Sequence, residues 1–218
     1  MIEIVPETGS TNSDLLTRLR TGEPLAEGDW LVADRQLAGR GRQGRPWSDG
    51  SGNLMGSTTV HIRPGDPPAP TLALLAGLAL YEAALPMVPD PSALHLKWPN
   101  DLLYGRAKLA GVLLEGQGDR VVVGIGVNLA VAPDLPGRAT CAFAHFGPAP
   151  DRDLFAATLA ATFARELDRW RTYGLAPIMR RWQAATLPAG TALTVHDPDG
   201  RSLTGAYAGL TDGGSLLL

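Results

Sequence analysis

Residues 39–47 read Gly-Arg-Gly-Arg-Gln-Gly-Arg-Pro-Trp, and the rest of the chain is best understood outward from this segment. Neither a helix nor a strand accommodates so much glycine, because each glycine loses more entropy on ordering than other residues do. Glycine lets backbone N–H groups approach an anion closely, and arginine binds phosphate or carboxylate bidentately. The segment is therefore typical of a loop that orders around a phosphorylated ligand, or of an arginine–glycine segment that binds RNA. On its own it favours neither.

The composition is that of an ordinary globular protein. The chain has 218 residues, 44% hydrophobic and 19% charged, with a net charge of −3, so no overall positive field attracts nucleic acid. One cysteine, Cys141, excludes an internal disulfide and a cysteine metal cluster and fits a reducing compartment. The N-terminus does not read as a signal peptide, and the longest apolar run is too short to cross a bilayer. We therefore expect a cytoplasmic protein with no membrane contact.

Lysine and asparagine are scarce in this chain. Of its 19 basic residues 17 are arginine, and the two lysines are Lys97 and Lys108. The four asparagines are Asn12, Asn53, Asn100 and Asn128. This usage indicates a coding bias that removes lysine wherever arginine serves as well, although chance could also leave two lysines behind. The remaining lysines are then expected where a planar guanidinium cannot replace a compact ammonium.

The hydrophobic pattern predicts an α+β fold, with helices packed on a mixed β-sheet. Expected helices follow residues 10–12 and cover 71–85, 151–173 and 175–185. Expected strands cover 30–35, 53–62, 93–98, 108–115 and 120–129, with a hairpin at 116–119 and a loop over 131–150. From residue 188 onward short β runs at 191–196, 202–207 and 213–218, with a turn at 197–200, predict a small appendage. We therefore expect two domains, 1–187 and 188–218.

Two short motifs allow more than one interpretation. Ser10, Thr11 and Asn12 stand at the start of a helix, where such residues usually serve as an N-cap, but three small polar side chains in a row can also bind a polar heterocycle. Position alone favours the cap. Gly124 and Gly126 form a Gly-x-Gly within a strand, which is weak as a dinucleotide motif because no third glycine opens a helix. Glycine in a strand more often marks close approach of a ligand or another backbone.

Four segments, in this order and spacing, resemble the biotin protein ligases, also called biotin–[acetyl-CoA-carboxylase] ligases. They are Ser-Thr-Asn at 10–12, Gln36 with the glycine–arginine loop, Lys-Trp-Pro-Asn-Asp at 97–101, and Lys-Leu-Ala-Gly at 108–111. Gly-Val-Asn-Leu at 126–129 also matches, and the resemblance extends from about residue 4 to the end. It implies the class II synthetase-like biotinyl/lipoyl ligase fold with a small SH3-like C-terminal domain.

The resemblance also implies the activity and its partners. Such an enzyme joins biotin to ATP, giving biotinyl-5′-AMP and pyrophosphate, and needs Mg²⁺. It then transfers biotin to a lysine of the biotin carboxyl carrier domain of a biotin-dependent carboxylase. The resemblance admits a homodimer. Because the chain begins nine residues before Ser10, we expect no DNA-binding domain and no repressor function; because it stops at Leu218, we expect a trimmed or reduced C-terminal domain.

Site residues are carried over from the resemblance position by position. The implied biotin-binding residues are Ser10, Thr11, Asn12, Gln36, Arg40, Gly41, Arg42, Lys108 and Gly111. The implied ATP- and adenylate-binding residues are Arg40, Arg42, Lys97, Asn100, Lys108 and Asn128. The implied catalytic residues are Lys108, Arg42, Lys97 and Asp101. Asp101 is the candidate Mg²⁺ ligand and also a candidate base for the transfer step.

The residue types suit this chemistry. A carboxylate and a phosphate must approach within bonding distance, so cations are needed to offset their repulsion, and positioning matters more than acid–base catalysis. The closest alternative is a lipoate or octanoate ligase or transferase of the same fold class, whose members lack the glycine–arginine loop. An RNA-binding module is a further alternative, against which stand the acidic balance and the lack of interleaved aromatic residues.

Overall fold

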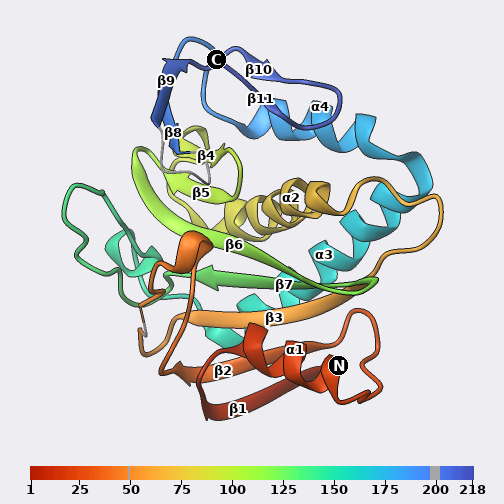
Figure 1. Cartoon of the computed structure of the whole chain (residues 1–218). Coiled ribbons are helices and arrows are strands. Elements are labelled where there is room, and N and C mark those ends of the chain that lie inside the picture. The colour runs from red at the N-terminus through yellow and green to blue at the C-terminus, as the bar shows by residue number, and fades with distance from the viewer. Residues whose placement is uncertain (49, 197–201) are drawn as a thin grey trace.

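A seven-stranded β-sheet forms the centre of the computed structural model, which describes residues 1–48, 50–196 and 202–218 (Figure 1). Its strand order is β1-β2-β3-β7-β6-β5-β4; β1 and β2 are parallel, and every other neighbouring pair is antiparallel. The strands are β1 (Ile2–Thr8), β2 (Trp30–Gln36), β3 (Leu54–His61), β4 (Leu94–Lys97), β5 (Asp101–Tyr104), β6 (Ala107–Gln117) and β7 (Arg120–Val127).

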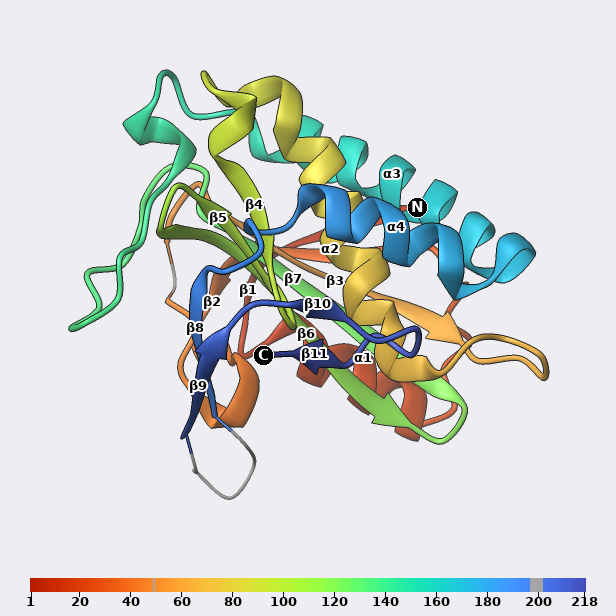
Figure 2. The ribbon, with the colours of Figure 1, turned by 90° about the horizontal axis from the view of Figure 1, so that it is seen from above.

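Helices cover the two faces of the sheet unequally (Figure 2). The main helices are α1 (Thr11–Arg20), α2 (Leu72–Ala84), α3 (Arg152–Tyr173) and α4 (Leu175–Ala185). Helices α2, α3 and α4 pack on one face, where they share the main hydrophobic core with the strands, whereas α1 packs on the other face with a smaller cluster. Single 3₁₀ turns are η1 (Arg42–Gly44), η2 (Ala69–Thr71), η3 (Leu85–Met87), η4 (Pro91–Ala93) and η5 (Phe143–His145).

Strand β7 shows how the sequence separates the two faces. Side chains alternate across a strand, so its valine and isoleucine residues at 121, 123, 125 and 127 all join the core beneath α2–α4. Gly124 and Gly126 fall on the opposite face. The centre of that face therefore carries no side chains from these two positions, which leaves room for a site.

Helix α2 is the central core helix. By length and composition alone the segment Ala69–Met87 could cross a membrane, but 61% of it is buried inside the protein. Thr162 of α3 donates to the carbonyl of Ala79, and Trp170 donates its indole N–H to Thr71 at 2.9 Å. The apolar character of α2 thus reflects packing between the sheet and helices α3 and α4.

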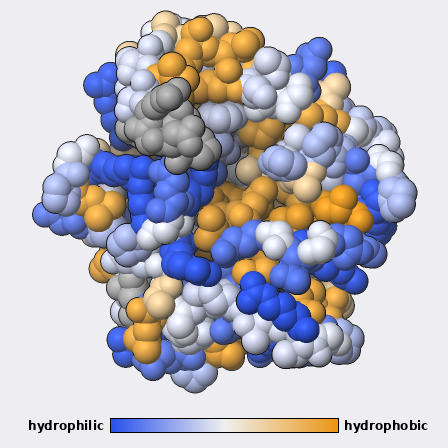
Figure 3. Space-filling view, in the orientation of Figure 1, coloured by the Kyte–Doolittle hydropathy of each residue, from blue (hydrophilic) through white to orange (hydrophobic). Residues whose placement is uncertain are grey.

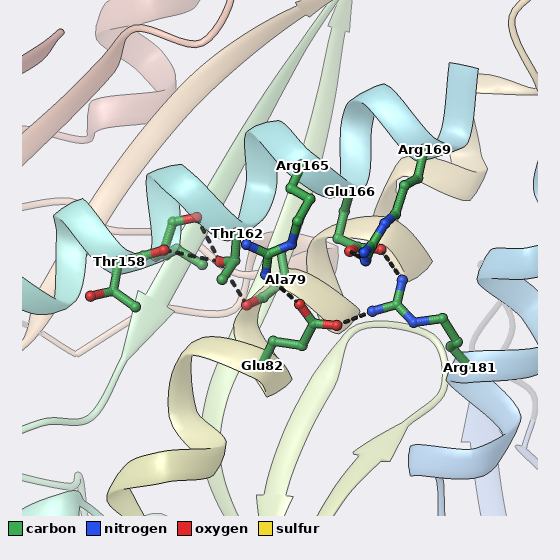
Figure 4. A network of polar contacts seen from close by, with 9 residues as sticks. Ala79, Glu82, Thr158, Thr162, Arg165, Glu166, Arg169 and Arg181 are labelled. Atoms are coloured by element: carbon green, nitrogen blue, oxygen red, sulfur yellow. Dashed lines mark hydrogen bonds and ion pairs between the residues drawn. The ribbon is translucent and has the colours of Figure 1, made fainter. Parts of the chain in front are cut away.

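Charged residues join these three helices (Figure 4). Glu166 of α3 is fully buried and accepts hydrogen bonds from Arg169 at 2.6 Å and from Arg181 of α4 at 2.5 Å. Arg181 also pairs with Glu82 of α2, which accepts a further bond from Arg165. A buried carboxylate needs such partners, and these fix how the three helices pack together.

A second ion cluster ties the end of α3 to the sheet. Arg171 donates to both carboxylate oxygens of Glu27, at 2.6 and 2.7 Å, and to the carbonyl of His61 at 2.8 Å. The hydrogen bond from Arg171 is the main cause that lowers the pKa of Glu27 to about 2. Glu27 is therefore ionised throughout the usual pH range and anchors the far end of the helix.

The C-terminal residues form two small antiparallel strand pairs. They are β8 (Ala192–His196) with β9 (Ser202–Ala206), and β10 (Gly209–Leu210) with β11 (Leu216–Leu217); over the described residues they do not close into a barrel. Tyr207 and Leu210 are buried in the main core, and Trp98 donates to the carbonyl of Gly214 at 3.0 Å. The turn expected at 197–200 lies outside the described residues, and the domain boundary at 188 stays a prediction.

The α+β prediction is confirmed, with two kinds of addition. The sequence pattern did not predict strands β1, β5 or β10, and it treated residues 99–101 only as a break after a strand. Within the glycine–arginine loop the chain makes one 3₁₀ turn, Arg42–Gly44, with Gln43 at a positive φ of 58°. Neither addition alters the fold class.

Candidate active site

A cavity of about 1450 Å³ opens on the sheet face that α2–α4 leave free. Figure 3 shows a hollow there, with hydrophobic residues at its floor and hydrophilic residues around it. Strands β3, β6 and β7 contribute the floor, and the start of α1, the loop at 39–48, the turn at 97–101 and the loop at 133–140 contribute the walls. Residues from β8, β9 and β11 complete one side.

A chain of buried hydrogen bonds lies at the start of α1. The backbone N–H of Thr11 donates to Gln36 Oε1 at 2.8 Å, and the Thr11 hydroxyl lies 2.7 Å from the hydroxyl of Ser57. Ser57 donates to Asn12 Oδ1 at 2.6 Å, and Asn12 Nδ2 donates to Glu115 at 2.8 Å. These contacts fix the rotamers of the polar groups before a ligand arrives. The arrangement suits a ligand with both N–H and C=O groups.

Ser10 occupies the N-cap position of α1 but does not cap it with its side chain. Its backbone is extended and its carbonyl accepts from Asp14 N, whereas its side chain makes no capping hydrogen bond. The residue is 5% exposed and lines the cavity. The side chain therefore belongs to the site, and the simple cap interpretation applies only to its backbone.

The glycines of β7 are required by close packing. A Cβ on Gly124 would lie 2.2 Å from Asn12 Oδ1, and a Cβ on Gly126 would lie 2.3 Å from the indole of Trp47. Both distances are far below contact, so any larger residue would displace these side chains. The Gly-x-Gly motif marks a close approach, but the groups that approach in this structure are side chains, not the ligand or backbone that the sequence indicated.

Lys108 and Asp101 form the charged centre of the site. Lys108 Nζ lies 2.6 Å from Asp101 Oδ1 and 5.5 Å from the centroid of the Trp47 ring, a cation–π geometry. Gly111 makes room for this lysine, since a Cβ there would lie 3.0 Å from Nζ. The indole N–H of Trp47 is buried and lacks a hydrogen-bond partner within the described part of the chain.

Two of the three arginines of the loop, Arg40 and Arg42, reach to different sides of the cavity. Arg40 donates to Ser13 Oγ at 2.9 Å and lies 3.4 Å from Glu115, beside the polar chain at α1. Arg42 donates to Asn100 Oδ1 at 3.2 Å, on the side of the 97–101 turn. Both guanidinium groups stay largely exposed, so they keep donors free for an anionic ligand.

Two asparagines hold the loops around the charged centre. Asn100 donates to the carbonyl of Val112 at 2.6 Å, which fastens the 97–101 turn to β6. Asn128 donates to the carbonyl of Cys141 at 3.0 Å, which holds the end of the following loop. Burial raises the pKa of the Cys141 thiol to about 11, so this cysteine is not an activated nucleophile.

Every site residue predicted from the sequence lines this one cavity. Lys97 lines it as well, and among residues 1–48, 50–196 and 202–218 no ion pair involves its ammonium. Ser57 and Glu115 were not predicted from the sequence, which also gave no role to Trp47. The strand at 54–60 contains Ser57, Thr58 and Thr59 in a row, so nothing in the sequence singles out Ser57, and the glutamate at 115 resembles any solvated charge.

A resident metal site is not evident. Within the described residues there is no group of three or more histidine, cysteine, aspartate or glutamate side chains that could hold an ion. Asp101 is an acidic residue at the charged centre. Mg²⁺ commonly binds through one or two carboxylates together with substrate phosphates, so Asp101 fits an ion that enters with a nucleotide.

Comparisons with known proteins agree on one family. Residues 6–131 match the model of the biotin/lipoate A/B protein ligase family. The biotin–[acetyl-CoA-carboxylase] ligase of Paracoccus denitrificans is 38% identical over 99% of this chain and 92% of its own length, and that of Mycobacterium tuberculosis is 34% identical over 100% and 82%. A biotin protein ligase from Aquifex aeolicus, solved in complex with biotin and ATP, is similar with a TM-score of 0.87 at 26% identity, over 100% of this chain and 90% of that one.

Proposed function

The chain belongs to the biotin/lipoate A/B protein ligase family, and from this premise we infer that it is an ATP-dependent biotin ligase. The enzyme activates biotin as biotinyl-5′-AMP with release of pyrophosphate, and then transfers biotin to a carrier protein of a biotin-dependent carboxylase. The observation that carries this conclusion is the meeting, in one cavity, of a buried polar chain at α1 with a cationic centre at Lys108.

We propose that the polar chain binds the ureido ring of biotin. A ureido group offers two N–H donors and one carbonyl acceptor, and the Ser10, Thr11, Asn12 and Gln36 side chains supply both kinds of partner. A lipoyl or octanoyl chain has no ureido N–H or C=O group with which to exchange hydrogen bonds with these side chains. The preorganised chain thus supports biotin over those acids.

The adenylation step requires two anions to meet. An oxygen of the biotin carboxylate attacks the α-phosphorus of ATP, the bond from that phosphorus to the bridging oxygen breaks, and pyrophosphate leaves with the electron pair. Lys108 lies where it can offset the negative charge on both partners, and Arg40 and Arg42 flank it. We assign Lys97 and Asn100 to the leaving phosphates and Asn128 to the nucleotide side.

Asp101 has two proposed roles, which belong to different steps. With ATP bound it would hold Mg²⁺ together with the phosphates, which supply the remaining oxygen ligands. In the transfer step it would take a proton from the ammonium of the acceptor lysine. The resulting amine attacks the acyl carbon of the adenylate, and AMP leaves.

The homodimer and the absence of DNA binding stay predictions.

Thermal unfolding separates this function from its alternatives. Biotin with ATP and Mg²⁺ should raise the melting temperature by several degrees, because a ligand held far above its Kd stabilises the folded state by a few kcal/mol. Lipoate with ATP should cause no such rise in the melting temperature, and neither should a single-stranded RNA added by itself. A shift with lipoate but not with biotin would contradict the assignment, and a shift with RNA alone would favour a nucleic-acid function.

A further inference from the structure

Asn53 is the one asparagine of the four without a place in the site. It is 2% exposed and follows the glycine–arginine loop where the chain returns to β3. The other three asparagines line the cavity, whereas Asn53 does not. In a chain that uses so little asparagine, a buried one outside the cavity calls for a physical explanation.

The side chain of Asn53 grips the segment that follows β7. Its Oδ1 accepts from the backbone N–H groups of Ala130 at 3.0 Å and Val131 at 3.1 Å. Its Nδ2 donates to the carbonyl of Val131 at 2.8 Å. An asparagine can make about four such bonds, so three of them are used on two consecutive residues of another loop.

Two glycines just before Asn53 in the sequence, Gly50 and Gly52, let the two segments pack closely together. A Cβ on Gly50 would lie 2.2 Å from Asn53 Nδ2 and 2.7 Å from a methyl group of Val131. A Cβ on Gly52, whose φ is +83°, would lie 2.9 Å from the Cβ of Ala130. The residues at 50–53 and 130–131 therefore fit together only because two of them lack side chains.

These segments are the roots of two loops that cover the site. The first loop carries Arg40, Arg42 and Trp47, and residues between 133 and 140 of the second loop line the same cavity. The second loop is also bonded to the charged centre. Lys108 N donates to the carbonyl of Ala139 at 2.8 Å, and Cys141 N donates to the carbonyl of Lys108 at 2.9 Å. Asn53 is thus the point where both loops are joined.

We propose that Asn53 is a positioning residue that couples the two loops, so that biotin and the nucleotide bind cooperatively. The inference rests on the proposed function, because it assumes that both ligands enter this cavity. When the first ligand orders its own loop, the hydrogen bonds of Asn53 hold the second loop in place, and the second ligand then loses less free energy to ordering. By linkage the effect is the same in either order of binding.

The test measures the affinity for biotin by calorimetry, with and without a saturating non-hydrolysable ATP analogue and Mg²⁺. In the unaltered protein the analogue should raise the affinity for biotin roughly tenfold, which is within the usual range of such coupling. In Asn53→Ala the affinity for biotin alone should change less than about twofold. The ratio of the affinities with and without the analogue should fall to about one. An enhancement retained in Asn53→Ala, or absent from the unaltered protein, would overturn the proposal.

A second variant disturbs the same contact through a neighbouring residue. Gly50→Ala introduces the clash with Asn53 and Val131 and should also abolish the enhancement, so it serves if Asn53→Ala fails to fold. Its matched control is Gly147→Ala, whose new methyl group meets nothing within 4 Å and which should keep the enhancement. If the unaltered protein does not bind biotin at all, the proposed function itself fails; binding without coupling removes only the role of Asn53.

Discussion

At the scale of single residues, the two lysines give the sharpest prediction. Lys97→Arg and Lys108→Arg keep the charge, but a guanidinium is wider and cannot converge its donors on crowded carboxylate and phosphate oxygens. Lys108 also has little room, since Asp101 lies 2.6 Å and the Trp47 ring centroid 5.5 Å from its ammonium. We expect each variant to release pyrophosphate from biotin and ATP at least about 10²-fold more slowly.

The matched control for the lysines is Arg165→Lys, a charge-preserving exchange on α3 far from the cavity, where Arg165 pairs with Glu82. It should keep its activity, and melting curves should show that all three variants fold. Near-normal turnover in both lysine variants would mean that chance left these lysines in the sequence, and the charged centre would need another explanation.

Ser57 gives a second prediction at this scale, because it bridges Thr11 and Asn12. Ser57→Ala removes contacts of 2.7 and 2.6 Å, after which, among the described residues, the Thr11 hydroxyl is held only by Gln36 and the Asn12 side chain only by Glu115. We expect the KM for biotin to rise roughly tenfold, the equivalent of one lost buried hydrogen bond, with kcat for adenylation little changed. The control is Thr58→Ala: the neighbouring hydroxyl donates to the carbonyl of Asp29 at 2.6 Å, outside the biotin site. Equal effects of the two variants on KM would contradict the assignment.

At the scale of elements, the glycine–arginine loop is expected to retain the adenylate. Arg42 reaches Asn100 in this structure and is largely exposed, so it is placed to clamp a phosphate once the loop closes. Arg42→Gly should weaken binding of biotinyl-5′-AMP by about 1.5–3 kcal/mol, the range for one charge-assisted hydrogen bond. Free adenylate should then accumulate in solution, detectable by chromatography. A variant that neither forms nor releases adenylate would show that Arg42 acts in the chemical step instead.

The ion cluster at the end of α3 gives a prediction about pH. The pKa of Glu27 is lowered to about 2 from an ordinary value near 4.5, so its stabilising effect is complete above that value and is lost as the pH falls toward 2. Glu27→Gln should therefore reduce the free energy of unfolding by up to about 3 kcal/mol at pH 7, and by less than about half of that near pH 3. Urea unfolding at several pH values measures the difference.

Glu23→Gln is the matched control for Glu27. Its carboxylate is 48% exposed and lies 3.9 Å from Arg18, so the exchange should change the free energy of unfolding by less than about 0.5 kcal/mol. If the two glutamine variants lose equal stability, or if the Glu27→Gln difference is as large at pH 3 as at pH 7, the cluster does not anchor α3 in the way described.

At the scale of the whole molecule, the elements with a clear hydrophobic period were predictable, whereas strands β1 and β5 were not. The apolar spacing predicts helix α3, and the turn residues at 116–119 predict the β6–β7 hairpin. Strand β1 contains Pro6 and lies at the sheet edge, where proline is tolerated because one side of the strand needs no partner. Strand β5 has only four residues and follows a tight turn, so it is too short for any hydrophobic period to show.

The site was predictable only where its residues form motifs. Local motifs named residues from five separate segments, and the fold brings them to one cavity. Ser57 and Glu115 belong to no motif: their importance arises because β3 and β6 place them beside Asn12, a contact across 45 and 103 residues of sequence. Asn53 acts in the same way, through loops that only the folded chain brings together.

The most direct test of the central claim is transfer to a carrier. The protein should be incubated with ATP, Mg²⁺, biotin and a purified biotin carboxyl carrier domain, and the carrier examined by intact-mass spectrometry and peptide mapping. The account predicts one added biotinyl group on a single lysine, none without ATP, and none when lipoate replaces biotin. An unmodified carrier, or a carrier that gains a lipoyl group instead, would contradict it.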